Sequence, residues 1–234
     1  MHKFCTRILI AVLLAGPPVF NSIPAWSASP QRDDAQLEHI LSELDKTSRD
    51  FRTLEAKIRN TKYTRIVDDT SVESGQLWFR RDPRGNKIKI EFKKPSQRDI
   101  LIADSRVVIY YPKINKLDNY ELGSDSMQNK AELGLLAGVG SSGQTLRNTY
   151  TIRYLGEERI DGKKTVKLAL SPRDPKAKTL FSTQEVWLDS NDWLPVRQKL
   201  VESSGDSLTI DFSDVKRNDR ISDKVFRIKN ATIK

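Results

Sequence analysis

Cysteine and histidine are nearly absent from this chain of 234 residues, which contains one cysteine and two histidines. Cys5 and His2 lie at the N-terminus, so only His39 remains beyond it. Thiolate nucleophiles, disulfides, nucleophile–base pairs and most structural metal sites need these residue types. His39 lies on the charged flank of an expected helix and is interpreted as a surface residue. The composition therefore argues against an enzyme and against a metal or other cofactor.

A long apolar run is also lacking after the N-terminus. Two basic residues precede an apolar run from Ile8 to Ala15, which is shorter than the ~20 residues of a membrane-spanning helix. This layout predicts a secretory signal peptide over residues 1–28, cleaved near Ala25–Ala28, with an uncleaved membrane anchor as the alternative. Export without disulfides favours a bacterial periplasm, and we expect one domain over residues 29–234.

The charge balance is positive, +9 for the whole chain and +7 without the two basic residues of the expected signal peptide. Solubility alone accounts for such an excess, and attraction to anionic lipid headgroups or to an acidic partner is the alternative. The basic residues alternate along expected strands instead of clustering with aromatic residues. We therefore expect no nucleic-acid partner.

Alternating hydrophobicity from Gly75 to Pro112 predicts three or four consecutive antiparallel strands. Ile88, Ile90 and Phe92 share one face, and the charged residues at 87, 89, 91 and 93 are expected to face solvent. A first strand is expected over Tyr63–Glu73.

Strand patterns resume at residue 150, with a tight turn at Asp161-Gly162 and a polar loop from Ser171 to Lys178. They continue to Phe212. About ten or eleven strands result, and a sheet this long tends to curl toward a barrel or to split into a sandwich.

An amphipathic helix of about 20 residues is expected within Gln36–Ile58, because apolar residues recur there at three- and four-residue steps. Its apolar stripe is expected to pack on the apolar face of the strands within 75–112. The stripe consists of Leu37, Ile40, Leu41, Leu44, Phe51, Leu54 and Ile58.

Residues 123–148 interrupt the β pattern with one or two short helical pieces. They form either a helix that fills the core or a mobile lid over a cavity. Gly138–Gly143 within them matches the dinucleotide fingerprint G-x-G-x-x-G, which has meaning only between a strand and a helix. A helical piece precedes it here and a β segment is expected to follow, so we interpret it as a hinge.

A curved sheet with helices across its mouth can enclose an apolar ligand. Arg81 shares parity with Leu77 and Phe79, so its guanidinium is expected to point inward, with helix C-terminal carbonyls as acceptors. Alternatively, a bulge at Asp82-Pro83 turns it outward. The predicted lid residues are Leu133, Leu135, Leu136, Leu41 and Leu44. The predicted cavity residues are Leu77, Phe79, Ile88, Ile90, Phe92, Ile102, Ile109, Tyr111, Val166, Leu168, Leu208 and Ile210.

Several stretches resemble the periplasmic outer-membrane lipoprotein carriers (the LolA-like family). They are GQLWFRR at 75–81 followed by Pro83 and Pro95, IAD at 102–104, VIYYP at 108–112, EVWLD at 185–189, and Leu194-Pro195. The resemblance implies a mainly β fold with α: an incomplete antiparallel β-barrel of eleven strands, with an N-terminal amphipathic helix and short lid helices.

The resemblance also implies non-enzymatic carriage of the acyl chains of lipoproteins, or of other lipids, toward the outer membrane. Arg81 then matches the family's arginine that holds the lid closed. The implied partners are acylated lipoproteins, an inner-membrane release complex and an outer-membrane acceptor, and we expect a monomer. The alternative is a periplasmic lipid-sensing regulatory domain that binds an envelope-stress signalling protein.

Overall fold

The computed structural model describes residues 30–83, 85–104, 106–121 and 139–228. The predicted signal peptide lies outside the described residues. Short 3-10 turns, η1 (Arg65–Val67) and η2 (Pro112–Ile114), connect two pairs of strands. The other elements are α1 (Pro30–Asp50), β1 (Thr53–Thr64), β2 (Asp69–Arg80), β3 (Lys87–Lys94), β4 (Arg98–Ala103), β5 (Arg106–Tyr111), β6 (Lys116–Glu121), α3 (Gly143–Thr149), β7 (Tyr150–Ile160), β8 (Lys163–Pro172), α4 (Pro175–Leu180), β9 (Phe181–Asp189), β10 (Pro195–Glu202) and β11 (Ser207–Arg217).

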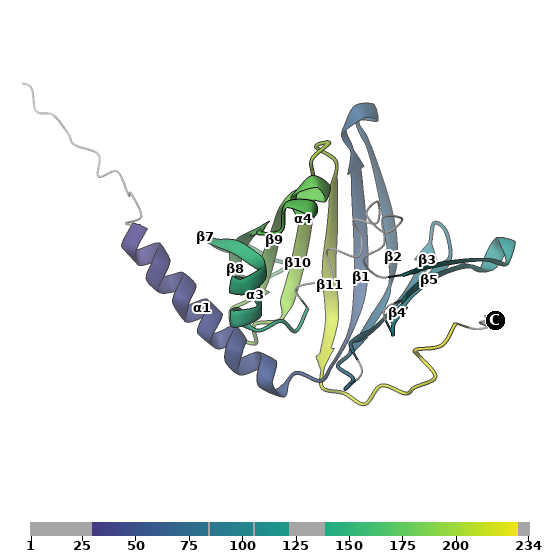
Figure 1. The fold of residues 1–234 in the computed structure, drawn as a ribbon, viewed down its shortest axis with the longest axis horizontal. Coiled ribbons are helices and arrows are strands. Elements are labelled where there is room, and N and C mark those ends of the chain that lie inside the picture. Colours follow the sequence, from purple (N-terminus) through teal and green to yellow (C-terminus); the bar gives the residue numbers. More distant parts are fainter. Residues whose placement is uncertain (1–29, 84, 105, 122–138, 229–234) are drawn as a thin grey trace, which may run out of the picture.

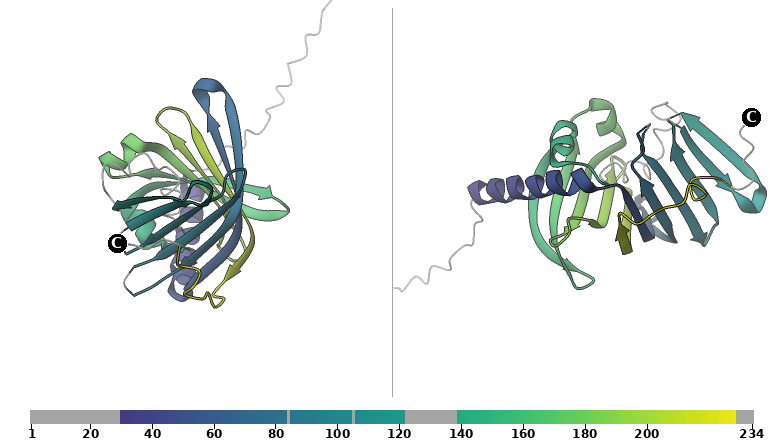
Figure 2. Two further views of the ribbon diagram at one scale, coloured as in Figure 1. Left: turned by 90° about the vertical axis from the view of Figure 1, so that its right-hand side faces the viewer. Right: turned by 90° about the horizontal axis from the view of Figure 1, so that it is seen from below.

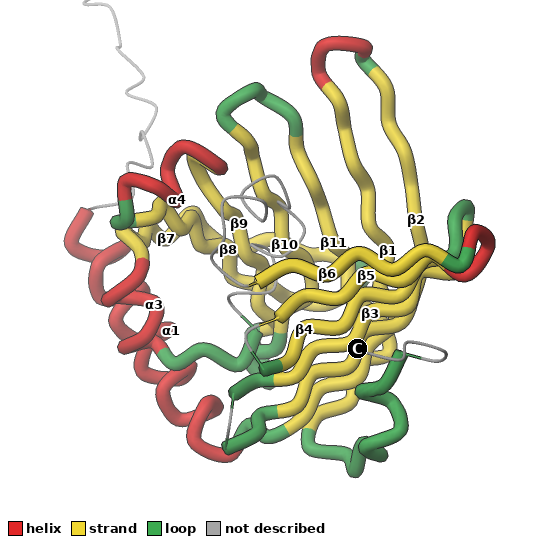
Figure 3. The backbone as a smooth tube through the Cα atoms, turned by 45° about the vertical axis from the view of Figure 1, so that its right-hand side comes forward, coloured by secondary structure: helices red, strands yellow, loops and turns green. Residues whose placement is uncertain are grey.

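The strands form one antiparallel sheet of eleven strands, in the order β6-β5-β4-β3-β2-β1-β11-β10-β9-β8-β7 (Figures 1 and 3). The sheet curves without closing, so β6 and β7 are its edges. The predicted fold class, a mainly β protein built on an incomplete antiparallel barrel, is confirmed. None of the helices in the described residues has the length and apolar character needed to cross a membrane.

Alternation along each strand places one set of side chains on an inner face. The register sets Phe79 opposite Ile88 and Leu77 opposite Ile90 on β2 and β3. Leu77, Phe79 and Ile90 belong to a single buried cluster that also contains Ile40, Leu41 and Leu44 of α1, and the partly buried Ile88 packs against it. Each fully buried side chain of this size contributes about 1.5–3 kcal/mol, so this cluster is the main source of stability.

The helix that the sequence predicts over Gln36–Ile58 ends earlier than expected, at Asp50. Asn218 Oδ1 accepts hydrogen bonds from the backbone N–H of Arg52 (2.8 Å) and of Thr53 (3.4 Å), and its Nδ2 donates to the Asp50 carbonyl (2.8 Å). These bonds satisfy backbone groups at the helix end. The helical part of the prediction is therefore wrong for Phe51, Leu54 and Ile58: Phe51 follows the helix, and the other two lie in β1.

The position of the first strand is also corrected. The predicted strand Tyr63–Glu73 spans the turn of the β1–β2 hairpin, with η1 at its tip, and the hairpin projects beyond most of the sheet (Figure 3). Asp68 takes the left-handed conformation (φ 48°) after η1 and ends the turn. The predicted loop Ser171–Lys178 is largely regular, because β8 continues to Pro172 and α4 begins with a proline, which is well suited to the first helical position.

The surface on which α1 packs differs from the predicted one. The helix packs against α3 and β7, on the half of the sheet that contains β7–β10, and not on β2–β5 (Figures 1 and 2). The reason is a close approach between α1 and α3. A Cβ added at Gly143 would lie 2.2 Å from the Leu41 carbonyl oxygen, so a larger residue would push the two helices apart.

The outer face of β3 is more covered than its alternation suggests. Lys89, predicted to face solvent, is 0% exposed and pairs with Asp99 (Nζ to Oδ2 3.1 Å). The register places it between Trp78 and Leu101, whose side chains shield it. Phe226, from the described C-terminal residues 218–228, lies by the outer face of β4 and β5.

Candidate functional site

The predicted cavity residues lie on the inner face of the sheet. All are buried except Ile88 and Tyr111, which are partly buried and pack against the same cluster. Among the predicted lid residues, Leu41 and Leu44 are buried on α1, whereas Leu133, Leu135 and Leu136 lie outside the described residues. His39 is exposed, with its ring 6.0 Å from that of Trp193.

An apolar cavity of about 30 Å³ lies between α1 and the inner face of β8–β10. Of the predicted residues, only Leu168 and Leu44 line it. Its volume is about that of one water molecule in the liquid, whereas ligand pockets measure roughly 300–1,000 Å³. Side chains of α1 therefore fill the space above β8–β10 in this conformation.

Gln198 and Trp193 also line this cavity, and the sequence pattern does not predict a place in a cavity for either residue. Gln198 is 1% exposed, and its Oε1 accepts no hydrogen bond within the described part of the chain. In the sequence it stands between Arg197 and Lys199 and looks like part of a solvated strand. Only its register opposite the inward-facing Ile210 places it inside.

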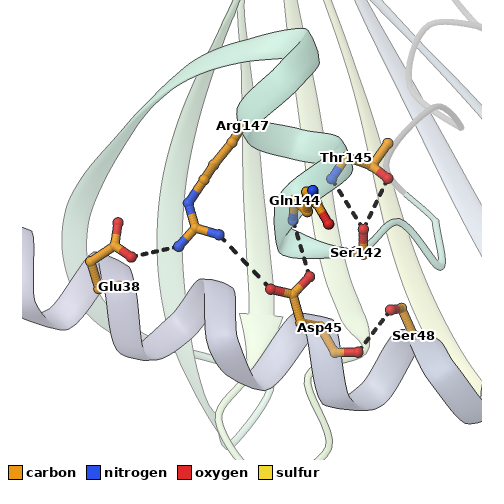
Figure 4. Close-up of polar contacts among 7 residues, drawn as sticks. All are labelled: Glu38, Asp45, Ser48, Ser142, Gln144, Thr145 and Arg147. Atoms are coloured by element: carbon orange, nitrogen blue, oxygen red, sulfur yellow. Dashed lines mark hydrogen bonds and ion pairs between the residues drawn. The ribbon is translucent and has the colours of Figure 1, made fainter.

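The α3 helix begins at the glycine-rich segment that matches the dinucleotide fingerprint. Ser142 is its N-cap, and the Ser142 Oγ accepts from the backbone N–H of Thr145 (3.0 Å; Figure 4). The expected β segment after Gly143 is therefore wrong, because α3 follows it. Gly140 has a φ of 71°, and a Cβ there would lie 2.6 Å from the Phe51 ring. Close packing accounts for both described glycines.

Polar contacts hold α3 on α1 (Figure 4). Arg147 forms ion pairs with Glu38 (2.6 Å) and Asp45 (3.8 Å), and the backbone N–H of Gln144 donates to Asp45 Oδ1 (3.0 Å). Water screens these groups because they lie at the surface, so each contact contributes about 0–1 kcal/mol. The two helices are held together by contacts that are individually weak.

Arg81 joins three segments at the end of β2. Its backbone N–H donates to the Arg52 carbonyl (2.7 Å). Its guanidinium donates to the carbonyl of Ser48, in the last turn of α1 (2.8 Å), and to that of Gly140 (2.7 Å). Carbonyls at a helix C-terminus attract cations. The residue is exposed at this end of the molecule, so its guanidinium bridges the rim and does not enter the interior.

Two tyrosines extend the apolar surface next to α3. Burial raises the pKa of the Tyr150 phenol. Burial also raises the pKa of Tyr154, with a further contribution from the negative charges of Glu157 and Asp33. Both side chains therefore stay neutral at physiological pH and act as apolar groups with a polar tip.

Solved structures with a similar fold are distant in sequence. A MucB crystal structure matches with a TM-score of 0.53 at 18% identity, covering 84% of this chain and 64% of MucB. An uncharacterised conserved protein from Thermus thermophilus matches with a TM-score of 0.50 at 16% identity, covering 84% of this chain and 96% of that protein. The lipoprotein LppX from Mycobacterium tuberculosis has a TM-score of 0.47 at 18% identity, covering 81% and 98%. The first two likenesses show the fold.

Comparison with curated protein sequences finds no match. The family model described as "Outer membrane lipoprotein carrier protein LolA" matches residues 49–229, which is well over half of the chain. The predicted resemblance is confirmed. The chain belongs to the LolA family of outer membrane lipoprotein carrier proteins.

Proposed function

We propose that this protein is a non-enzymatic periplasmic carrier, exported by a signal peptide within residues 1–28, that holds acyl chains of lipoproteins or other lipids on its inner face. The observation that carries the proposal is the large apolar inner face of an open sheet, with α1 and α3 across one half of it. Each buried methylene contributes about 0.8 kcal/mol, so a 14-carbon chain would gain roughly 11 kcal/mol.

Loading requires a movement of α1, because the cavity beneath it measures about 30 Å³. The polar contacts opposing this movement are the two guanidinium bonds of Arg81 and the pairs between α1 and α3. The exposed pairs contribute about 0–1 kcal/mol each and the two guanidinium bonds about 0.5–1.5 kcal/mol each, so an acyl chain has enough binding energy to displace them. Arg81 is thus proposed as the latch of the empty, closed form.

The first test is native mass spectrometry of protein purified from the cell envelope. Bound acylated species would support the proposal, and a reproducibly empty protein would count against it. The alternative function, a regulatory domain that binds an envelope-stress signalling protein, rests on the fold it shares with MucB, of which the chain spans 64% of the length. Enrichment of a signalling protein instead of lipoproteins from envelope extracts would favour that alternative.

The second test is Arg81→Leu, with Arg80→Leu as the matched control. Arg80 pairs with Asp223 (2.6 Å) and stacks on Phe226, whereas Arg81 bonds to α1. Removing bonds that exist only in the closed form favours the loaded form, by about 2 kcal/mol or roughly 30-fold. The Arg81 variant should therefore retain lipid more tightly and transfer it to an acceptor more slowly. Transfer equal to that of Arg80→Leu would remove Arg81 from the mechanism.

A further inference from the structure

A polar pocket of about 220 Å³ opens beside the inner face at the far end of β2 from Arg81. The register places two of its residues, Asn60 and Lys62, opposite Glu73 and Ser71, on the same face of β1 as the buried Ile58. The pocket is therefore continuous with the apolar inner face. Its lining residues are Asn60, Lys62, Ser71, Glu73 and Arg98.

Asn60 provides an unpaired acceptor in this pocket. The residue is 2% exposed, and its Nδ2 donates to Glu73 Oε2 (3.3 Å). Turning the amide over would set two acceptor oxygens against each other, so this bond fixes its orientation. Within the described part of the chain, Asn60 Oδ1 has no hydrogen-bond partner. An unsatisfied buried acceptor is unfavourable, so a donor group on a ligand would be stabilised there.

The charges of the pocket favour an anion. Glu73 Oε2 also accepts from the Arg98 guanidinium (2.6 Å), so its charge is already paired. Lys62 is exposed at the rim and leaves the lining with an excess of one positive charge. The Arg98 guanidinium lies 4.5 Å from the centre of the Phe92 ring, a member of the core cluster, and so links the polar pocket to the apolar surface.

We propose that this pocket binds the phosphate-containing headgroup of a lipid whose acyl chain lies on the inner face. Lys62 and Arg98 contact the phosphate, and a hydroxyl or amine of the headgroup donates to Asn60 Oδ1. The volume, about seven times the ~30 Å³ share of one water, suits a small headgroup such as phosphoglycerol. This inference rests on the proposed carrier function and adds the class of lipid.

The experiment compares two lipids of equal chain length, lysophosphatidylglycerol and monoacylglycerol, in displacing a fluorescent fatty acid from the full chain. The wild type is expected to bind the phospholipid about tenfold more tightly, the size of effect given by a hydrogen bond to a charged group. Lys62→Gln is expected to reduce that preference to about twofold or less. The matched control is Arg59→Gln, which removes one positive charge from the exposed, outer side of the same strand and should keep the preference.

Asn60→Leu, checked for folding by circular dichroism, tests the acceptor and should weaken the binding of lysophosphatidylglycerol several-fold. Equal binding of the two lipids by the wild type would overturn the headgroup site and leave the carrier function intact. Binding of neither lipid would overturn both. If glycerol phosphate displaced lysophosphatidylglycerol at matching concentrations, the pocket would be a site for a soluble phosphate. The proposal that the phosphate belongs to a lipid headgroup would then be overturned. If Arg59→Gln lost as much of the lipid preference as Lys62→Gln, the preference would come from the overall charge of the protein, and the headgroup site would be overturned.

Discussion

A single asparagine fixes the point at which α1 gives way to β1. Asn218 follows β11 and takes the left-handed conformation (φ 64°), from which its amide group reaches the chain near Asp50. Its backbone N–H also donates to the Thr53 carbonyl (2.9 Å). The segment that follows β11 thus holds the C-terminal end of α1. The Arg81 guanidinium binds the last turn of the same helix.

Asn218→Gly should lower the free energy of unfolding by about 2–3 kcal/mol, because three side-chain hydrogen bonds are lost while glycine still accepts the left-handed φ. Urea denaturation measures the change. The matched control is Asn115→Gly, since Asn115 is also left-handed (φ 47°) but makes one side-chain bond, from the Tyr110 hydroxyl (3.1 Å). Losses of equal size in the two variants would contradict the role assigned to Asn218.

Asp189, at the turn between β9 and β10, makes a pH-dependent contribution to the free energy of unfolding. Burial tends to raise its pKa, but the backbone N–H of Asn191 and the ammonium of Lys163 (3.0 Å) outweigh burial, and the pKa is lowered overall. A lowered pKa stabilises the fold above the unfolded-state value of about 4, and this contribution is lost as the pH falls below it.

Asp189→Asn should therefore be less stable than the wild type at pH 7, with a difference that shrinks at pH 3. Urea denaturation at the two pH values measures both differences, so the other carboxylates cancel in the comparison. A difference that does not change with pH would show that Asp189 acts through its hydrogen bonds alone and not through its charge.

At the scale of elements, the pairing of α1 with α3 combines a tight backbone contact with weak polar ones. Gly143 permits the contact with Leu41, and Arg147 adds the exposed ion pairs. A pair of helices built in this way fits closely when closed but separates at modest cost. That balance is what a loading movement of α1 would need.

Gly143→Ala should destabilise the protein by about 1–3 kcal/mol, because the new Cβ would meet the Leu41 carbonyl oxygen and force α1 and α3 apart. Chemical denaturation gives the loss of stability, and hydrogen exchange in α1 should become faster. Gln144→Ala is the control, since Gln144 is exposed and its bond to Asp45 comes from the backbone N–H. A Gly143 variant as stable as this control would refute the close contact.

For the whole molecule, the open sheet has a consequence for stability. The two halves of the sheet meet at β1 and β11, and they share the apolar cluster of the inner face. A ligand that covers this face would bind the folded chain and not the unfolded chain. Binding and unfolding are therefore thermodynamically linked.

A saturating acyl lipid should stabilise the protein by about 2.7 kcal/mol when its free concentration is 100 times its dissociation constant. Urea unfolding with and without the lipid measures the shift. A short-chain analogue with the same headgroup is the control, because it lacks most of the methylenes that the inner face would cover. An unchanged transition with the long-chain lipid would argue against the inner face as the binding surface.

The sequence by itself determined most of the strands and the apolar face of β2 and β3, because alternation is a local property, whereas β1 was assigned in part to a helix. The buried parity of Leu77, Phe79, Ile88 and Ile90 could be read directly, and so could the turn at Asp161-Gly162. The family could be recognised from short local stretches for the same reason.

Only the tertiary structure decided the features that depend on distant contacts. Asn218 sets the end of α1, and the close approach of Gly143 to Leu41 sets the surface on which α1 packs. The cross-strand neighbours of Lys89 bury its side chain. The polar lining at Asn60 and Gln198 likewise emerges only when strands far apart in the chain are set in register. Local periodicity records which face of an element is apolar, but not which partner covers it.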